Sequence, residues 1–228
     1  MNNKVISLQV GKVKSHGDKN SKEFLEKYWE SASFKDVVED KVWANKLSLV
    51  GDEVADKVHH GGLDKAIFAN SYENYEHWAE FLNLKDIPFG ALAENLTLSG
   101  FHESNVCLGD VHRVGAALLQ VTQPRKPCWK ISRKWNNQNF TKEIFTSGLT
   151  GWYYRVLEEG YIKSGDKISI VSQEELKISI LEVNQAFIKA DKDTLKNILY
   201  IPSIAKSYKT SIQKKLEGVY NIDYMKTI

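Results

Sequence analysis

The sequence is poor in cysteine and has no long apolar run. Only Cys107 and Cys128 occur among its 228 residues, 21 positions apart. Two thiols cannot hold a four-thiolate iron–sulfur cluster, and there is no CxxC pair for a zinc site. No apolar run approaches the roughly 18 residues that span a bilayer, and residues 1–15 lack the apolar core of a secretory signal. We therefore expect a cytoplasmic protein with reduced cysteines and no membrane partner.

The glycine-rich signatures of nucleotide enzymes are also missing. The sequence contains neither GxGxxG nor GxxxxGK followed by Ser or Thr, which argues against a dinucleotide fold and a phosphate loop. It also lacks HExxH and GxSxG, which argues against a zinc protease and an α/β-hydrolase, and we expect no pyridoxal phosphate. The net charge is only +2, too small for a polyphosphate-binding surface over the whole molecule. Any electrostatic function has to come from a local pattern.

Glycine and tryptophan are concentrated in the first three quarters of the chain. Thirteen of the 14 glycines lie at or before Gly165, and all six tryptophans precede residue 153. Short alternating or apolar runs separated by turns fill this part and predict a mostly β body. The expected strands are 4–13, 64–70, 94–98, 110–114, 116–122, 152–158 and 166–171.

Helical spacing occurs at a few places in this body and dominates after residue 173. Ser71 is a candidate N-cap for a helix to Leu82, and a second helix is expected within 128–146. Near the C-terminus, Asp191 can cap a helix through Leu199, and Pro202 can open a last one. A further apolar helical face is formed by Leu176, Ile180, Val183 and Phe187. Such short helices need partners, so we expect a small bundle or packing against the β body.

Cys128 lies in an unusually basic stretch, VTQPRKPCWK. No acidic residue occurs between Asp110 and Glu143, whereas seven Lys and Arg residues do. Nearby cations favour a thiolate, as does a helix N-terminus if Cys128 begins the helix suggested by WKISRKW. Two prolines restrict the backbone before the thiol. These features suit a nucleophile or a metal ligand, although free cysteine is also a common small buried residue. For Cys107, in SNVCLGD, the structural interpretation is preferred.

Two other segments offer groups that could support Cys128. HHGGLDK (59–65) combines histidine and lysine with a glycine pair that can expose backbone N–H groups to an anion. FGALAENLTLSG (89–100) places Glu94 and Asn95 at a turn entering a strand. Taken singly, each is weak evidence, because His59 or His60 can be an ordinary surface histidine and Asn95 a turn cap.

The ordered motifs resemble the MOSC superfamily (molybdenum cofactor sulfurase C-terminal domain), and within it the YiiM-type proteins. The matching pieces are KVHHGGLDKA, FGALAENLTLSG, ESNVCLGD, QVTQPRKPCWK and GLTGWYYRVLEEG, which together span about 57–171. The resemblance implies a mostly β fold: a MOSC-type β-barrel-like domain with a few helices over 1–171. It also implies a three-helix C-terminal extension over 172–228, so it covers nearly the whole chain.

The resemblance further implies that the protein binds the molybdenum cofactor, with the thiolate of Cys128 as a metal ligand. A soft sulfur suits such a metal, and a cationic wall suits an anionic pterin phosphate. Arg125 and Lys65 are then assigned to phosphate or oxo groups, and Glu94 either to proton handling or to structural hydrogen bonding. Arg155 either reaches the cofactor or forms a surface ion pair. The residues expected to bind the pterin are His60, Gly61, Gly62, Asn95, Thr122 and Gln123.

The implied reaction is reduction of N-hydroxylated small molecules, such as hydroxylaminopurines, hydroxylamines and amidoximes. With no cluster cysteines and no nucleotide motif, the chain is expected to take electrons from a separate reductase. A homodimer stays open, as does the purpose of the C-terminal helices. The alternatives are a sulfur carrier with a Cys128 persulfide and a non-catalytic cofactor carrier. Nucleic acid is the less favoured partner, because the net charge is small and no binding motif is present.

Overall fold

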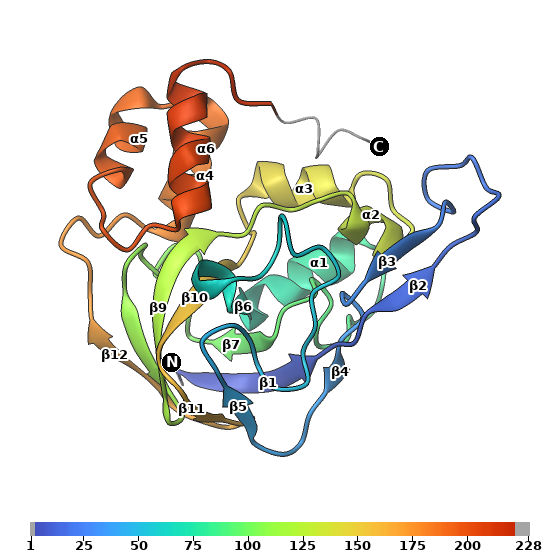
Figure 1. Cartoon of the computed structure of the whole chain (residues 1–228), viewed down its shortest axis with the longest axis horizontal. Helices are drawn as coiled ribbons and strands as arrows, with labels where there is room; N and C mark the ends of the chain where they lie inside the picture. The colour runs from blue at the N-terminus through green and yellow to red at the C-terminus, as the bar shows by residue number, and fades with distance from the viewer. Residues whose placement is uncertain (1–2, 222–228) are drawn as a thin grey trace.

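An eight-stranded sheet forms the body of the molecule in this computed structural model, which describes residues 3–221 (Figure 1). The strand order is β12-β8-β9-β10-β6-β7-β1-β4. All neighbours run antiparallel except β6 and β7, which are parallel. The strands are β1 (Lys4–Val10), β4 (Asp36–Val37), β6 (Ile67–Ser71), β7 (Leu96–Ser99), β8 (Val111–Val114), β9 (Ala117–Pro124), β10 (Trp152–Glu158) and β12 (Ile168–Ser172).

The sheet curls until its first strand meets the segment that leads into its last one. Backbone hydrogen bonds of 2.8–2.9 Å join residues 3–5 to residues 165–168, around an isolated bridge between Lys4 and Lys167. No continuous ladder closes the sheet within the described part of the chain. The expected barrel is therefore correct only in part: the protein has a mixed, sheet-rich fold, because a single bridge joins the two ends of the sheet.

Burial alternates along β10, so successive side chains point to the core and to the opposite side of the strand. Trp152, Tyr154 and Val156 are buried in the main core, whereas Tyr153 and Arg155 are only partly buried. Side chains of a strand point alternately to its two sides, so burial of the first set directs the second set to the opposite face. The register of β10 thus places Tyr153 and Arg155 beside the loops described below.

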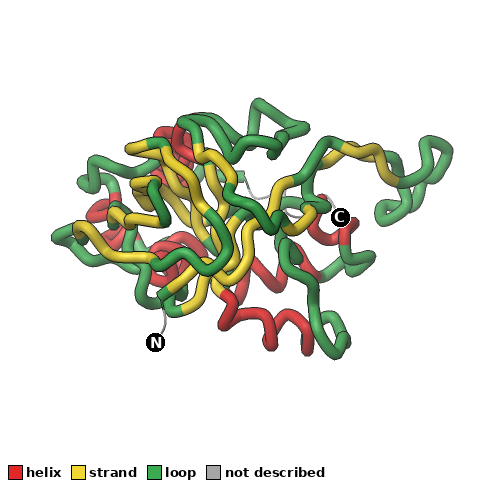
Figure 2. The backbone as a smooth tube through the Cα atoms, turned by 90° about the horizontal axis from the view of Figure 1, so that it is seen from below, coloured by secondary structure: helices red, strands yellow, loops and turns green. Residues whose placement is uncertain are grey.

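Four short strands form two small ribbons outside the main sheet. β2 (Lys14–His16) pairs with β3 (Trp29–Ser31), and β5 (Val42–Ala44) pairs with β11 (Gly160–Ile162). Figures 1 and 2 show the β2–β3 hairpin projecting away from the sheet. The seven expected strands all have counterparts, but these four strands and β4 were not predicted. Segments of two or three residues are too short to show a period.

The helices of the body lie close to where the sequence predicts them. The expected helix after Ser71 begins with a 3-10 turn, η2 (Tyr72–Asn74), and continues as α1 (Tyr75–Phe81). The stretch 128–146 contains α2 (Lys130–Lys134) and α3 (Phe140–Ser147). Cys128 itself does not begin a helix: Trp129 is the N-cap of α2, a helix of only five residues. The contribution of a helix dipole to the thiol is therefore small.

Three further helices, α4 (Ile180–Lys189), α5 (Lys192–Ile198) and α6 (Lys206–Leu216), lie together near one end of β9 (Figure 1). Ser179 and Glu182 form a capping box on α4, and Asp191 caps α5 as predicted. Leu176 precedes α4 and is 49% exposed, so it is not on the expected helical face. The helices share an apolar cluster that includes Val183, Phe187, Leu195, Ile198, Tyr208 and Ile212, together with Leu108 from the body.

The last helix begins four residues after Pro202, the expected start. Contacts with the body set the boundary: Ala205 N–H donates to the carbonyl of Thr122 (3.0 Å), and Lys206 N–H donates to the carboxylate of Asp64 (3.0 Å). A side-chain acceptor from outside the helix thus replaces the usual N-cap. The end of the predicted extension, 222–228, lies outside the described residues. No helix within 3–221 is both long and apolar enough to cross a membrane.

Candidate functional site

Two adjoining pockets meet at Cys128. The inner pocket is further lined by residues such as Lys35, Asp52, Asn95 and Arg125. The outer pocket, a cavity of about 550 Å³, is further lined by Gln123, Lys126, Trp129, Ser207 and Ser211. The residues common to both pockets are Asp56, His60, Lys65, Cys128, Lys130 and Tyr153. The structure therefore brings the HHGGLDK and QPRKPC segments together, as expected of a shared site.

The loop that carries Cys128 is fixed on both sides of the thiol. β9 ends at Pro124, and Arg125 N–H donates to Gly151 O (3.1 Å). The hydroxyl of Thr141 donates to the carbonyl of Cys128 itself (3.1 Å). The half-buried Cys128 Sγ lies 4.0 Å from His60 Nε2. The thiol is thus held at the junction of the pockets instead of being sealed in the core.

Cys107 has the opposite environment. It is buried, and its backbone N–H donates to the carboxylate of Asp110 (3.1 Å). Burial, reinforced by Asp110, raises the pKa of the Cys107 thiol to about 11. A thiol with such a high pKa stays protonated near neutral pH, which fits the structural role expected for it.

His60 is a half-buried neutral base beside Cys128. Burial is the largest cause that lowers its pKa to about 4, and the positive charges of Arg125 and Lys65 act in the same direction. Near neutral pH one ring nitrogen therefore donates and the other accepts. His60 can hydrogen-bond either the thiol or the thiolate without adding a positive charge to the pocket. A negatively charged ligand would offset the two cations and draw a proton toward the ring.

Arg125 is a buried cation without an ion pair in the described part of the chain. The residue is 8% exposed, and its Nη1 has no hydrogen-bond partner among residues 3–221. Its guanidinium lies over the ring of Phe68, 5.2 Å from the centroid, and no carboxylate in that range forms an ion pair with it. Leaving a buried charged donor unsatisfied costs free energy. This guanidinium is thus the strongest sign of a missing anionic ligand.

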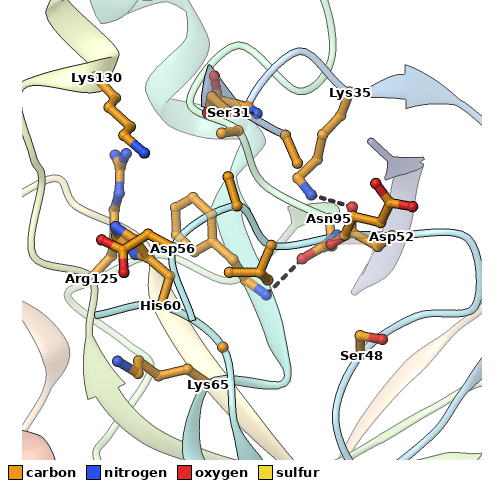
Figure 3. A pocket seen from close by; sticks show the side chains of 18 of the residues that line it. Ser31, Lys35, Ser48, Asp52, Asp56, His60, Lys65, Asn95, Arg125 and Lys130 are labelled. Atoms are coloured by element: carbon orange, nitrogen blue, oxygen red, sulfur yellow. Dashed lines mark hydrogen bonds and ion pairs between the residues drawn. The ribbon is translucent and has the colours of Figure 1, made fainter. Parts of the chain in front are cut away.

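The glycine pair shapes the loop next to Lys65. Gly61 and Gly62 have φ angles of 74° and 86°, which only glycine adopts easily. Among residues 3–221, no atom beyond Gly62 and its two chain neighbours lies within 4 Å of where a Cβ would stand on Gly62. Gly61 lines the inner pocket, whereas Gly62 lines neither pocket. Lys65 donates to the carbonyl of His59, and burial lowers its pKa. In Figure 3, Lys65, His60, Asp56, Arg125 and Lys130 gather on one side of the inner pocket.

Asn95 lines the inner pocket but is already fully engaged. Its amide oxygen accepts from Phe68 N–H (3.1 Å), and its nitrogen donates to Gln9 O (3.3 Å) and to Asp52 (2.8 Å). The Asp52 carboxylate also pairs with Lys35, and both side chains are only 6% exposed (Figure 3). This buried ion pair was missed because no sequence pattern links two residues 17 positions apart. Asn95 therefore supports the wall of the pocket through Asp52.

Glu94 is buried and lines neither pocket. Its carboxylate accepts hydrogen bonds from Gly90 N–H (3.0 Å), Leu92 N–H (2.9 Å), the Thr97 hydroxyl (3.2 Å) and the Tyr75 hydroxyl. Four donors satisfy a carboxylate almost completely. Of the two roles expected for Glu94, this environment favours the structural one.

The remaining sequence candidates divide between pocket and scaffold. Gln123 lines the outer pocket, where its side-chain oxygen accepts from the Ser207 hydroxyl (3.4 Å). Thr122 is buried outside both pockets, with its hydroxyl 2.6 Å from Asp64 O. Arg155 donates from Nε to the Asp64 carboxylate (3.0 Å), so it forms the ion pair considered as one of its two roles.

Comparisons with known proteins agree on one family. Residues 56–169 match the MOSC domain. YiiM of Escherichia coli is 33% identical over 192 residues, covering 81% of this chain and 84% of that protein. A protein named Reductase from Gibberella moniliformis is 34% identical over 68% of this chain, but the match covers only 28% of the fungal protein. The crystal structure of YiiM from Geobacillus stearothermophilus has a TM-score of 0.77 and 31% identity, covering 94% of this chain and 99% of that one.

Proposed function

The chain belongs to the MOSC domain family as a YiiM-type member, and on this basis we propose that it binds the molybdenum cofactor and reduces N-hydroxylated small molecules. The observation that carries the proposal is the buried guanidinium of Arg125, which lines the same pocket as Cys128 and whose Nη1 has no hydrogen-bond partner among residues 3–221. A soft sulfur and an unsatisfied buried cation in one pocket fit a ligand that combines a soft metal with an anionic group.

The donor set fits such a cofactor better than a free metal ion. Within residues 3–221, no group of three or more His, Cys, Asp or Glu side chains is placed to hold a metal. Cys128 would thus be the protein ligand, and the pterin dithiolene would supply the other sulfur ligands. Arg125 and Lys65 would bind the anionic groups, and the exposed backbone at Gly61 and Gly62 would offer N–H donors.

The proposed reaction converts R–NHOH to R–NH₂ and water and consumes two electrons and two protons. When bound, the cofactor would supply a metal centre able to take up an oxygen atom and to change its oxidation state by two electrons. The chain itself orients and screens this chemistry. The loop at Cys128 fixes the metal ligand, and the neutral ring of His60 can pass a proton at Nε2. The outer pocket, which opens beside the same thiol, gives the substrate room to reach it.

A separate reductase would supply the electrons. Most of the Gibberella moniliformis protein named Reductase has no counterpart in this chain, because the match covers 28% of it. The matched segment there forms part of a much longer protein, and we infer that the electron donor of this chain is a partner protein. Turnover should consequently require an added reductase or a reduced dye.

Metal and pterin analysis of protein from a host that makes the cofactor tests the proposal. We expect molybdenum and pterin in equal amounts in the wild type, and neither in a Cys128→Ala variant. Reduction of a hydroxylamine by the loaded protein with a reduced dye completes the test. A persulfide carrier would instead contain labile sulfane sulfur without molybdenum. A cofactor carrier would be loaded but would not turn over any N-hydroxylated substrate.

A further inference from the structure

We propose that the C-terminal helix α6 fixes the geometry of this site, because it clamps together the two cationic loops that meet there, the loop of Cys128 and the loop of Lys65. Lys126 and Asp64 act as the positioning residues of this clamp. The inference rests on the proposed function for the identity of the natural ligand, but the clamp itself rests only on contacts in the structure. It assigns a role to the helical unit for which the sequence left several alternatives open.

The first anchor joins α6 to the loop of Cys128. Lys126 forms no ion pair with a carboxylate of residues 3–221 and places its amine in a cage of aromatic rings. Nζ lies 4.9 Å from the ring centroid of Tyr208, 5.0 Å from that of Tyr220 and 5.4 Å from that of Phe187. It also donates to the Ser211 hydroxyl and to the Tyr220 hydroxyl (3.2 Å). Each cation–π contact of this kind contributes about 1 kcal/mol while the amine is protonated. Burial lowers the pKa of Lys126 to about 7, and the hydrogen bonds to the Ser211 and Tyr220 hydroxyls hold the amine in either form.

The second anchor joins the beginning of α6 to the loop of Lys65. Asp64 lies in the short helix η1 (Leu63–Lys65), and its carboxylate accepts the backbone N–H of Lys206 (3.0 Å) and Nε of Arg155 (3.0 Å). The carbonyl of Asp64 lies 2.6 Å from the hydroxyl of Thr122, whose own carbonyl accepts from Ala205 N–H (3.0 Å). Side chain and backbone therefore fix the same junction.

Both anchors contact α6 and hold opposite sides of one site: Lys126 contacts Tyr208 and Ser211 of this helix, and Asp64 contacts its first residue, Lys206. Lys206 and Ser211 are five positions apart, about 7.5 Å along a helix axis. Between them, Ser207 faces the outer pocket and donates to Gln123 (3.4 Å). Arg125 directly precedes Lys126, and Cys128 follows it by two positions, whereas Lys65 directly follows Asp64. Moving either anchor would change the distance between the cations on the two loops.

Whether Asp64→Ala strengthens or weakens anion binding distinguishes a positioning role of Asp64 from a purely electrostatic one. Asp64→Ala removes a negative charge and releases Arg155, so charge alone predicts tighter binding of an anion. Loss of the clamp predicts weaker binding, as it does for Lys126→Met. The probe is inorganic pyrophosphate, measured by how well it protects Cys128 from iodoacetamide in a Cys107→Ser background. Lys209→Met, which removes an exposed lysine of α6 outside both pockets, is the matched control.

We expect the half-protecting pyrophosphate concentration to rise about fivefold in both Asp64→Ala and Lys126→Met. It should stay unchanged in Lys209→Met and be partly restored in Lys126→Arg, which keeps a cation in the cage. In cells that make the cofactor, both anchor variants should retain roughly tenfold less molybdenum and pterin than the wild type. Circular dichroism checks that each variant is folded; if either fails to fold, Ser211→Ala and Asp64→Asn replace them in the same assay.

Tighter or unchanged pyrophosphate binding by Asp64→Ala would overturn the clamp, as would wild-type cofactor content in both anchor variants. If pyrophosphate protects the wild type no better than chloride of equal ionic strength, the cationic pocket is refuted and the clamp with it. A wild type that contains no molybdenum when purified contradicts the proposed function alone, because the protection assay still measures the clamp.

Discussion

The sulfur of Cys128 faces a neutral imidazole, with 4.0 Å between Sγ and Nε2 of His60. This relationship differs from a catalytic cysteine–histidine ion pair, since the low pKa of His60, about 4, leaves the ring uncharged near neutral pH. A protonated ring would be the partner of an activated nucleophile. The pair instead keeps a soft donor available next to the cationic groups of the pocket, which suits metal ligation.

The two cysteines should behave oppositely when they are replaced. Cys128→Ala should lose at least about 90% of the bound molybdenum and all reductase turnover, because it removes the protein ligand. Cys107→Ala should keep both and lose about 1 kcal/mol of the free energy of unfolding, because it shortens a buried side chain. Metal analysis and urea denaturation check the pair. Turnover in Cys128→Ala would eliminate the proposed ligand.

Replacing Arg125 should separate stability from function. Arg125→Met keeps the contact with Phe68 but removes a buried charge that has no partner within the described chain. We expect the free energy of unfolding of the cofactor-free protein to rise by about 1 kcal/mol, while molybdenum content falls. Urea denaturation and metal analysis of the same preparation provide the two measurements.

Arg125→Lys is the control for this experiment, because it keeps the charge without the planar fork that binds an oxyanion with two hydrogen bonds. It should retain an intermediate amount of cofactor. A large loss of stability in Arg125→Met would show that the guanidinium has a structural partner instead of an anionic ligand.

Glu94→Gln tests whether this buried carboxylate is structural. In glutamine one carboxylate oxygen is replaced by an amide nitrogen, which cannot accept, so either Gly90 N–H or Leu92 N–H would lose its acceptor. We expect a loss of about 2 kcal/mol in the free energy of unfolding, with unchanged turnover per bound molybdenum. Thr97→Val, which removes one of the same donors, should have a smaller effect. A stable Glu94→Gln protein without turnover would return Glu94 to a catalytic role.

Local pattern was sufficient to predict the main strands and the residues that approach Cys128. Alternation of bulky residues in GWYYRV predicts β10, and the glycines and cations of two motifs predict which loops form the pocket. The expected closure of the sheet into a barrel was wrong in degree. Closure depends on how residues 3–5 meet residues 165–168, and no local sequence period encodes that contact. The ribbon strands were missed since each spans only three residues.

Residue type did not reveal which polar groups are free to bind a ligand. Asn95 and Glu94 stand in the right motif, yet the fold uses their hydrogen bonds internally. Arg125 and Lys126 are adjacent and chemically alike, but Arg125 lines the inner pocket with Nη1 free of hydrogen bonds to residues 3–221, whereas Lys126 enters an aromatic cage beside the outer pocket. Such differences arise from tertiary contacts with distant segments, above all α6, and a single sequence carries no signal for them.

The buried histidine His112 should make the protein less stable in mild acid. Burial lowers its pKa from the ordinary 6.5 to about 4; its ring contacts the Tyr154 hydroxyl (2.8 Å) and faces the Asp110 carboxylate at 4.0 Å. Between pH 6.5 and 4 the unfolded chain binds a proton that the folded protein does not, so stability falls as pH falls through this window. The difference amounts to about 3 kcal/mol for this residue.

His112→Asn keeps a hydrogen bond for Tyr154 but cannot titrate, so its free energy of unfolding should decline less from pH 6.5 to 4. Urea denaturation at several pH values measures both slopes, and subtraction removes the shared effect of other groups such as His60. Parallel curves for the two proteins would show that His112 takes up its proton without unfolding.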